Sequence, residues 1–572
     1  MIGKWTKYKA NLMLSTSTVN ETVGARRFND IITTMMVGCA TLVGSTQAAH
    51  ALNLYDGSSN GNNLEINLTT TISYTPIWRV GSPSAILTSA KNANQSEGDL
   101  DFQHGLVSNE FEILPVLDIK DGDYGAHFSG EGYINTSFLG HNQNDQPSTL
   151  NPFSVARTDD FTSATRNADG LNARVLDAFA YGSEHFGPDE SQTLTIKVGR
   201  QTLLWGQSLF LSNNGIAAGM APIDILTADN NPNAQTQAII SPVGQVVVTY
   251  QINPAVTLQG YYQFEWQHDA FPGVGSFFSS ADFFDKGGQR LIAAPGAFLF
   301  RAKDLSPPSQ NGQFGASVQL TLGDYDLGFF GLRYDSKTPA IYTHPGTPTP
   351  TSNGLSVGTF NLVYPRDIWL EGTSLSTTVG PVSVGGEISF RQHMDLVNQG
   401  VVALPGNNAN GNPAYPVGNT MAGQASFIYL SPGIPLDPGG VSLAGEVGFN
   451  HVLSVTANKA ELSSDSTGSL NRSTTAAQLE IVATPTYYHV LPKLDLGFPI
   501  GFAYDFYGRS MVDPTENNGT GSVNFGVTAT YDTTWIESIT YNDFLGAPNP
   551  VLLGESELAD RSYVLFNIQH SF

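Results

Sequence analysis

The chain has 572 residues, a net charge of −24 at pH 7 and only 13% charged residues, about half of the roughly 25% that soluble domains contain. The strongly acidic balance excludes a nucleic-acid-binding role, which needs a basic surface. The only apolar run longer than a strand lies near the N-terminus, which excludes a helical membrane protein. The composition favours an outer-membrane β-barrel, in which apolar and polar residues alternate.

Residues 1–51 have the pattern of a secretory signal peptide. Two arginines precede the apolar stretch "IITTMMVGCATLV", and the small-residue pattern "STQAAHA" follows it, so we expect cleavage after Ala51. Residues 1–24 exceed what such a leader needs, and we expect a later translation start. The alternative is a lipoprotein signal in which the only cysteine, Cys39, carries the lipid. Residues 52–572 are then expected to form one barrel.

Strands with one apolar and one polar side recur along the chain. In "LEINLTTTISYT", Leu64 and Ile66 fall on one side and Glu65 and Asn67 on the other, which is the period of a β-strand. We predict about 18 such strands in a closed antiparallel transmembrane β-barrel. They are expected to begin near residues 64, 106, 123, 171, 192, 244, 255, 313, 325, 366, 381, 420, 441, 474, 490, 521, 534 and 563.

Short and long connections alternate between these strands. Tight turns such as "KDGD", "LGD" and "VGP" alternate with connections of more than a dozen residues, the pattern of periplasmic turns and external loops. Some of the long loops are expected to fold into the lumen. Because a closed barrel pairs its last strand with its first, "YVLFNIQHSF" is expected to complete the wall. A soluble β-sandwich is the alternative.

Charged residues on the polar faces are expected to line the lumen, because carboxylates are costly in lipid. They form either a selectivity surface or an ion-paired wall that maintains the barrel's shape. The predicted lumen charges are Glu110, Glu112, Glu131, Glu371, Glu387, Arg391, Glu446 and Glu480.

Two apolar segments are candidates for the pathway of an apolar solute. The first, "VGRQTLLWGQSLFLSNNGIAAGMAPIDILTADNNPNAQ", is too apolar for an ordinary surface loop. It is predicted to fold inward, where it would offer apolar surface, or else to pack on neighbouring loops. The second, "YYQFEWQHDAFPGVGSFFSSADFFDKGG", is predicted to form an external aromatic vestibule, or else an aromatic girdle and a loop core. The proposed pathway residues are Trp205, Phe210, Met220, Tyr261, Glu265, Phe277, Phe278, Phe283 and Phe284.

Catalytic and metal-binding patterns are weak. "GQSLF" lacks the second glycine of a nucleophile elbow, and "DGD" and "DFFD" lack EF-hand spacing. We therefore predict no catalytic residues, no cofactor and no metal site.

Four stretches resemble the domain-of-unknown-function 1302 family of Gram-negative outer-membrane proteins. They are "SEGDLDFQHGLVSNEFEILPVLDI", "LDAFAYG…LTIKVGRQTLLWGQSLFLSNNGIAAGMAPID", "YYQFEWQHDAFPGVGSFFSSADF" and "YPRDIWLEGTSLSTTVG…GGEISFR", spread over residues 97–391. The resemblance implies a porin-like barrel that moves hydrophobic compounds such as sterols, aromatics or lipids. It also implies that Phe572 belongs to the signal by which the barrel-assembly machinery recognises its clients. At Gln207 the family usually has an acidic residue.

Two functions follow as hypotheses. The first is an outer-membrane channel for small hydrophobic or amphipathic solutes. The second is a plugged barrel that serves as an envelope scaffold or as part of a lipid-export assembly with periplasmic or inner-membrane partners. The expected contacts are outer-membrane lipid, the barrel-assembly machinery and the solute, without nucleic acid.

Overall fold

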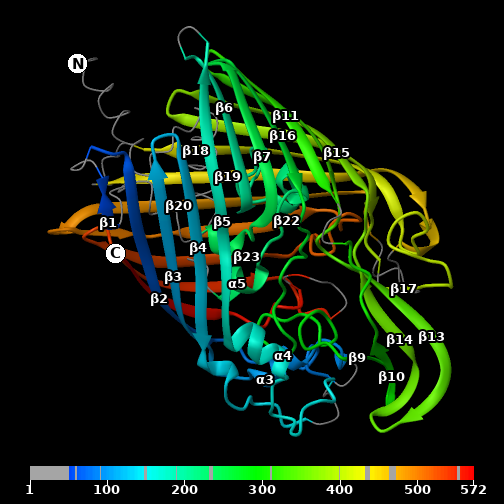
Figure 1. Cartoon of the computed structure of the whole chain (residues 1–572). Helices are drawn as coiled ribbons and strands as arrows, with labels where there is room; N and C mark the ends of the chain where they lie inside the picture. The colour runs from blue at the N-terminus through cyan, green and yellow to red at the C-terminus, as the bar shows by residue number, and fades with distance from the viewer. Residues whose placement is uncertain are drawn as a thin grey trace.

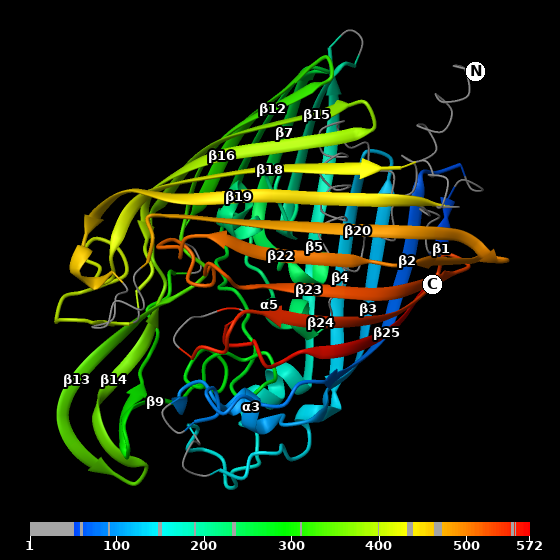
Figure 2. The same cartoon turned by 180° about the vertical axis from the view of Figure 1, so that it is seen from behind.

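In a computed structural model, the chain forms a closed antiparallel β-barrel (Figures 1 and 2). The structure describes residues 51–57, 61–89, 92–146, 151–187, 190–230, 236–308, 312–398, 400–431, 439–462, 472–550, 554 and 556–572. The predicted fold class is confirmed. The predicted signal peptide lies, except for Ala51, outside the described residues, so its cleavage remains a prediction.

The barrel wall has 18 positions, each strand pairing antiparallel with its neighbours along the chain. The positions are β2 (Leu64–Arg79), β3 (Gly105–Asp121), β4 (Tyr124–Asn135), β5 (Leu171–Phe186), β6 (Gln192–Gln201), β7 (Val243–Asn253), β8 (Val256–Gln263), β11 (Gln313–Leu322), β12 (Tyr325–Tyr334), β15 (Ile368–Val379), β16 (Val382–Asp395), β18 (Val417–Leu430), β19 (Gly440–Ala457), β20 (Thr475–Leu491), β21 with β22 (Leu494–Gly497 and Ile500–Tyr507), β23 (Gly521–Tyr531), β24 (Trp535–Leu545) and β25 (Tyr563–Ser571).

The observed strands begin close to the predicted positions. Several starts coincide, including those of β5 and β25, and the largest difference is at β21, predicted near 490 and observed at Leu494. The strand at this position is interrupted at Pro499, which has no N–H to donate. The ladder nevertheless continues, because the Phe498 N–H donates to the Pro485 carbonyl at 2.9 Å.

The last strand closes the barrel, as predicted. β25 pairs antiparallel with β2, and Thr70 and Phe572 exchange backbone hydrogen bonds of 2.8 and 3.0 Å. The short strand β1 (Leu52–Asp56) pairs with the start of β2, next to the part of β2 that pairs with β25. The seam leaves neither β2 nor β25 with an open edge along the paired residues, as the bilayer requires.

The outward face of the wall carries the apolar half of the alternating pattern. Aromatic side chains on this face gather at two levels, the arrangement of a membrane-embedded barrel. Near the ends of the wall that carry the long loops, called here the loop end, the exposed aromatics include Trp78, Phe264, Phe314 and Trp369; near the opposite, turn end they include Tyr124, Phe186, Tyr325, Tyr531, Trp535 and Phe572.

The long loops form most of the remaining structure. Five strands, β9 (Arg290–Ala294), β10 (Ala297–Arg301), β13 (Ala340–Thr351), β14 (Gly354–Val363) and β17 (Val401–Val402), make a second sheet that extends from the loop end (Figure 1). The helices are α3 (Glu97–Asp101), η4 (Thr136–Phe138), α4 (Ser163–Thr165), η5 (Arg166–Gly170), η6 (Ser212–Asn214), η7 (Ile216–Gly219), α5 (Ile225–Asn230), α6 (Thr236–Ile239) and η8 (Lys459–Glu461). Among the described residues, no helix combines the length and the hydropathy needed to span a bilayer.

Burial of the inward-facing side chains increases toward the loop end. Along β2, Glu65 is exposed, Asn67 and Thr69 are half-buried, and Ser73 and Thr75 are buried. β16 repeats this order, from exposed Ser383 at the turn end to the buried residues of its loop-end half. The loops therefore pack into the loop-end half of the barrel, while side chains of these two strands at the turn end remain accessible to solvent.

Candidate functional site

Among the loops that the structure describes, one crosses the barrel interior. It connects β6 to β7, two strands that pair with each other, and we call its described residues, 202–230 and 236–242, the strap. Its helix α5 lies within the barrel outline in both views (Figures 1 and 2). The prediction that this apolar segment folds inward is confirmed, and its contacts explain how it is held.

Glu446 on β19 holds the tip of the strap. Its carboxylate accepts hydrogen bonds from three consecutive backbone N–H groups, those of Leu209 at 3.1 Å, Phe210 at 2.6 Å and Leu211 at 2.7 Å. A charged acceptor makes such bonds stronger than bonds between neutral groups. This inward glutamate is therefore a structural anchor and is not available as a free pore charge.

Glu387 and Arg391, both on β16, hold the same tip. The Glu387 carboxylate accepts hydrogen bonds from the N–H groups of Gln207 at 2.5 Å and Ile216 at 2.8 Å. The Arg391 guanidinium donates to the carbonyl of Gly215 at 2.7 Å. The wall thus binds both the donors and the acceptors of the strap backbone, which satisfies polar groups that burial would otherwise leave unpaired.

Arg174 on β5 holds the returning part of the strap on the opposite wall. Its guanidinium pairs with Glu131 on β4 at 2.5 Å and with Asp224 of the strap, and it donates to the Ala238 carbonyl at 2.9 Å. Strands β5 and β19 lie half of the ring apart. The strap is therefore fixed at two opposite sides of the barrel.

The apolar side chains of the strap pack against the wall between these anchors. Trp205 and Met220 are only 3% and 1% exposed, in a cluster with residues of β8, β12 and β15. The Trp205 ring lies 5.1 Å from that of Tyr261, and its Nε1–H donates to Gln259 at 2.6 Å. The prediction that Trp205, Met220 and Tyr261 offer surface to a solute is wrong for this conformation, because their apolar surface is already buried; Phe210 remains half-buried.

Most other predicted lumen charges do face inward. Glu110 and Glu112 on β3 and Glu131 on β4 are buried, and Glu112 accepts a hydrogen bond from Ser73 at 3.0 Å. Glu480 lies half-buried on β20, directly across from Glu446. Contacts of this kind support the ion-paired or hydrogen-bonded wall over an open selectivity surface.

Two predicted inward carboxylates lie elsewhere. Glu371 is exposed on the outward face of β15, two residues from Trp369 of the aromatic level, where a charge costs little because the headgroups are near. β8 ends at Gln263, before the predicted alternation reaches Glu265, and Glu265 pairs with Arg200 at 2.8 Å beside Phe264 at the rim. Both predictions of a lumen position are corrected.

The predicted aromatic vestibule is also corrected. Phe277 and Phe278 are 2% and 7% exposed and form a loop core with Phe102, Phe138 and Phe161, packed on residues of β2, β3 and β25. Half-buried Phe283 and Phe284 pack on other rings, those of Phe360 and Phe271 at 5.8 and 5.0 Å. Phenylalanine in a long loop minimises its contact with water by packing on other loops, so the loop-core alternative is the correct one.

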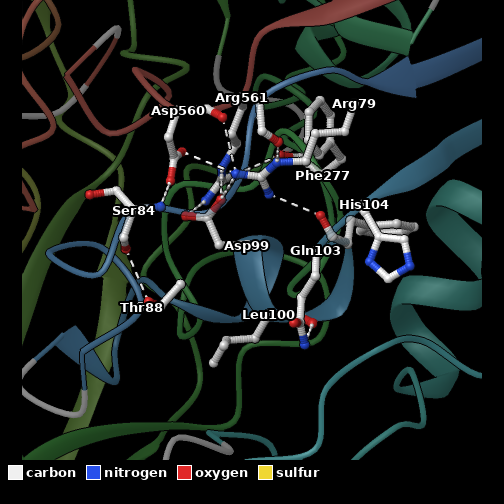
Figure 3. A network of polar contacts seen from close by, with 12 residues as sticks. Arg79, Ser84, Thr88, Asp99, Leu100, Gln103, His104, Phe277, Asp560 and Arg561 are labelled. Atoms are coloured by element: carbon white, nitrogen blue, oxygen red, sulfur yellow. Dashed lines mark hydrogen bonds and ion pairs between the residues drawn. The ribbon is translucent and has the colours of Figure 1, made fainter.

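A buried ion network joins three loops to the wall at this end (Figure 3). Arg79, at the end of β2, and Arg561, just before β25, converge on Asp99 of α3 at 2.8 and 3.2 Å. Arg561 also donates to the Phe277 carbonyl at 2.6 Å, and Asp560 lies 3.4 Å from Arg79. We call the described residues of these three loops (80–89, 92–104, 264–308, 312, 546–550, 554 and 556–562), together with residues 136–146 and 151–170, whose Phe138 and Phe161 pack on them, the cap.

Three buried carboxyl groups, those of Glu97, Asp101 and Asp282, accompany this network. Asp282 accepts the N–H groups of Ser96 at 2.8 Å and Glu97 at 3.1 Å. Burial raises the pKa of Asp282 to about 7, although those N–H groups lower it. Burial, and then the charge of Asp282, raise the pKa of Glu97 and Asp101 well above the usual range of carboxyl groups. Burial therefore favours the protonated form of Glu97 and Asp101.

The structure also identifies anchors that sequence analysis missed. Arg174, Asp224, Asp99 and Arg561 lie far apart in the sequence and meet only in the folded protein. The available signal was the low content of basic residues. An arginine next to an apolar strand is rarely buried without a carboxylate partner, so each of these few arginines predicts such a partner.

Within the described part of the chain, one group of side chains has metal-ligand spacing: His141, Asp159 and Asp160. Arg157 pairs with Asp159 at 2.6 Å, and His141 contacts Asp160 at 2.8 Å. Ion pairs at the surface account for these contacts.

Comparison with known proteins gives one family. Solved structures with a similar course include OccAB1 of Acinetobacter baumannii (10% identity, TM-score 0.41, covering 92% of this chain and 98% of that one). They also include a BenF-like porin from Pseudomonas fluorescens Pf-5 (8% identity, TM-score 0.42, covering 89% of this chain and 98% of that one). A third is Pseudomonas aeruginosa OpdK with vanillate (9% identity, TM-score 0.37, covering 88% of this chain and 98% of that one). A search of curated proteins found no match. Residues 32–572 match the family described as "Protein of unknown function (DUF1302)", and the chain therefore belongs to the DUF1302 family.

Proposed function

We propose that the protein is an outer-membrane channel of a Gram-negative bacterium, in which the strap restricts passage to small solutes. The observation that carries the proposal is a strap anchored on two opposite walls of a closed barrel. Porin-sized barrels conduct unless loops fill them. A strap that crosses the interior reduces the open cross-section of the barrel through which a solute can pass, and no additional domain is needed.

The solute class is proposed from charge and from the strap's surface. The chain carries a net charge of −24, which lowers the local concentration of anions. Most inward carboxylates are engaged in hydrogen bonds, and Phe210 keeps part of its ring accessible at the strap tip. Small hydrophobic or amphipathic solutes without negative charge fit these features, in agreement with the family resemblance.

A plugged barrel that serves as an envelope scaffold is the second candidate. The burial of inward side chains at the loop end, such as Thr75 and Asn567, supports it. Such a barrel would act through periplasmic or inner-membrane partners, and the turn end is the side on which they would bind.

Planar-bilayer recording of the purified protein distinguishes the candidates. A channel gives steady single-channel steps that a neutral aromatic solute reduces, and cations carry more of the current than anions. Absence of any step over a wide range of voltage would reject the channel and favour the scaffold. Proteoliposome swelling with neutral solutes of increasing size then measures the aperture.

A further inference from the structure

We infer that the strap is a two-part gate: its roots and returning part are fixed on the part of the wall from β5 to β15, while its tip, residues 206–215, is a latch that releases from β16 and β19. The inference deepens the proposed channel function, on which it rests. The two attachments differ in chemistry, and that difference decides which of them can open.

The fixed attachment combines covalent, ionic and apolar contacts. Both strap ends continue into the paired strands β6 and β7. Arg174 binds Asp224, and buried Lys337 donates to the Gly219 carbonyl at 3.0 Å. Trp205 and Met220 bury their side chains nearby. Opening this side would expose aromatic surface and separate a buried ion pair, both of which cost free energy.

The latch is mainly polar and uses the strap's backbone. Four N–H groups of the tip, and that of the adjoining Ile216, donate to two wall carboxylates, those of Glu446 and Glu387. Arg391 binds two carbonyls, and Asn214 donates to the Phe449 carbonyl at 2.9 Å. Each of these groups can exchange its partner for water when the tip moves into a wetted lumen, so the latch loses little on opening compared with the apolar root.

The tip itself contains few apolar anchors. Within residues 206–215, Leu209 and Leu211 are buried, but Phe210 is only half-buried. Ile216, which is fully buried, packs in the cluster of Trp205 and Met220 and therefore belongs to the fixed part of the strap. Three glycines lie in or near the tip, and an ideal Cβ on Gly206 or Gly215 would meet the Glu387 carboxylate at 2.1 and 2.8 Å. The close approach of the backbone to the Glu387 carboxylate favours glycine at both positions, and the φ of +105° at Gly206 favours it further. The strap tip is therefore matched to Glu387.

The chain offers a position for a reversible lock. An ideal Cβ on Gly385 of β16 would lie 3.4 Å from the Gln207 Cβ, near the separation in a disulfide. The double substitution Gln207→Cys with Gly385→Cys, with Cys39 replaced by Ser, should therefore cross-link the tip to the wall. Oxidation holds the latch shut, and reduction frees it.

The first measurement reports the movement of the tip without using conductance. Leu209→Cys, in a chain with Cys39 replaced by Ser, is labelled with a water-soluble maleimide. Glu446→Ala combined with Glu387→Ala is expected to raise the labelling rate about tenfold or more, because buried hydrogen bonds to charged acceptors are removed. Glu371→Gln is the matched control, since it removes one carboxylate from the outward face, and should leave the rate unchanged. Equal rates in the double variant and the control would overturn the inference.

The second measurement connects the movement to passage. Conductance of the double variant should exceed that of the wild type, and oxidation of the cysteine pair should lower conductance until a reductant restores it. Faster labelling with no conductance in any variant would leave the latch standing and reject the channel. Conductance that neither the glutamate substitutions nor the disulfide alters would leave the channel standing and reject the gate.

Discussion

At the scale of single residues, carboxylates do most of the positioning in this barrel. Glu446 binds three N–H groups and Asp99 two guanidinium groups. Sequence analysis placed Glu446 on the correct face because strand alternation determines the side of the wall. It could not identify the partners, because a backbone N–H is common to all residues but proline and leaves no signature in the sequence.

Replacing Arg561 tests the cap network. In Arg561→Gln, Asp99 keeps only Arg79 and the Phe277 and Ser279 carbonyls lose their donor, so the free energy of cap opening should fall by about 3–5 kcal/mol. Faster amide hydrogen exchange in residues 80–104 would measure this fall in the free energy of cap opening. Arg157→Gln, at an exposed ion pair, should cause no detectable change. In Arg561→Gln, Asp99 and Asp560 share the single guanidinium of Arg79. A second variant, Asp99→Asn with Arg561→Gln, should therefore recover part of the loss, because it leaves one carboxylate for one guanidinium. Unchanged exchange in Arg561→Gln would contradict the assignment.

The buried acids of the cap predict a pH dependence. Since the pKa of Asp282 is raised to about 7, its contribution to cap stability is complete below the pKa of the unfolded chain and is lost as the pH rises through about 7. Protease cleavage within the cap should therefore accelerate as the pH rises from about 4 to about 7, the interval between the unfolded and folded pKa values of Asp282. Asp282→Asn should flatten this dependence; a cap that becomes more resistant with rising pH would reverse the predicted sign.

At the scale of elements, strands were predictable and loop structure was not. The wall strands follow from period-two alternation, because one face meets lipid and the other the interior. The second sheet was missed: β13 contains Pro345, Pro348 and Pro350, which argue against a central strand, and it is found instead near a sheet edge, where proline is tolerated. The turn at Pro295–Gly296 between two apolar runs was a usable signal for the β9–β10 hairpin.

Removing the main apolar anchor tests whether the strap is an independently stabilised element. Trp205→Ala should destabilise the strap by about 3–5 kcal/mol through loss of buried surface and a cavity. Faster hydrogen exchange in residues 203–220 measures the effect, and the barrel should still migrate as a folded band in an unheated gel. Phe210→Ala, at a half-buried ring, should have a much smaller effect; equal effects of the two changes would show that the wall cluster does not hold the strap.

At the scale of the whole molecule, closure of the barrel sets the requirement on the last strand. Phe572 exchanges backbone hydrogen bonds with Thr70, while its side chain is exposed on the outward face near Trp535. The side chain is therefore dispensable for pairing. Its predicted role in recognition by the barrel-assembly machinery can be separated from its role in the seam.

Phe572→Ala should refold in detergent as the wild type does, because its backbone still pairs with Thr70. In cells it should accumulate at a lower level in the outer membrane, because the exposed terminal aromatic is missing. Heat-modifiable gel migration measures the first result and membrane fractionation the second. Normal accumulation in cells would remove Phe572 from the assembly signal, and failed refolding would show that the ring stabilises the seam itself.

The sequence by itself determined the barrel, the number and order of its strands, and the face to which most side chains point, because lipid on one side and a polar interior on the other impose alternation on every strand. Only the tertiary structure decided what the inward groups do. Glu387, Glu446 and Arg174 meet a strap that is distant in the chain, and the aromatic residues expected along a solute pathway are buried against one another. Those outcomes depend on which long loop enters the interior and where it finds hydrogen-bonding partners, which local periodicity does not encode.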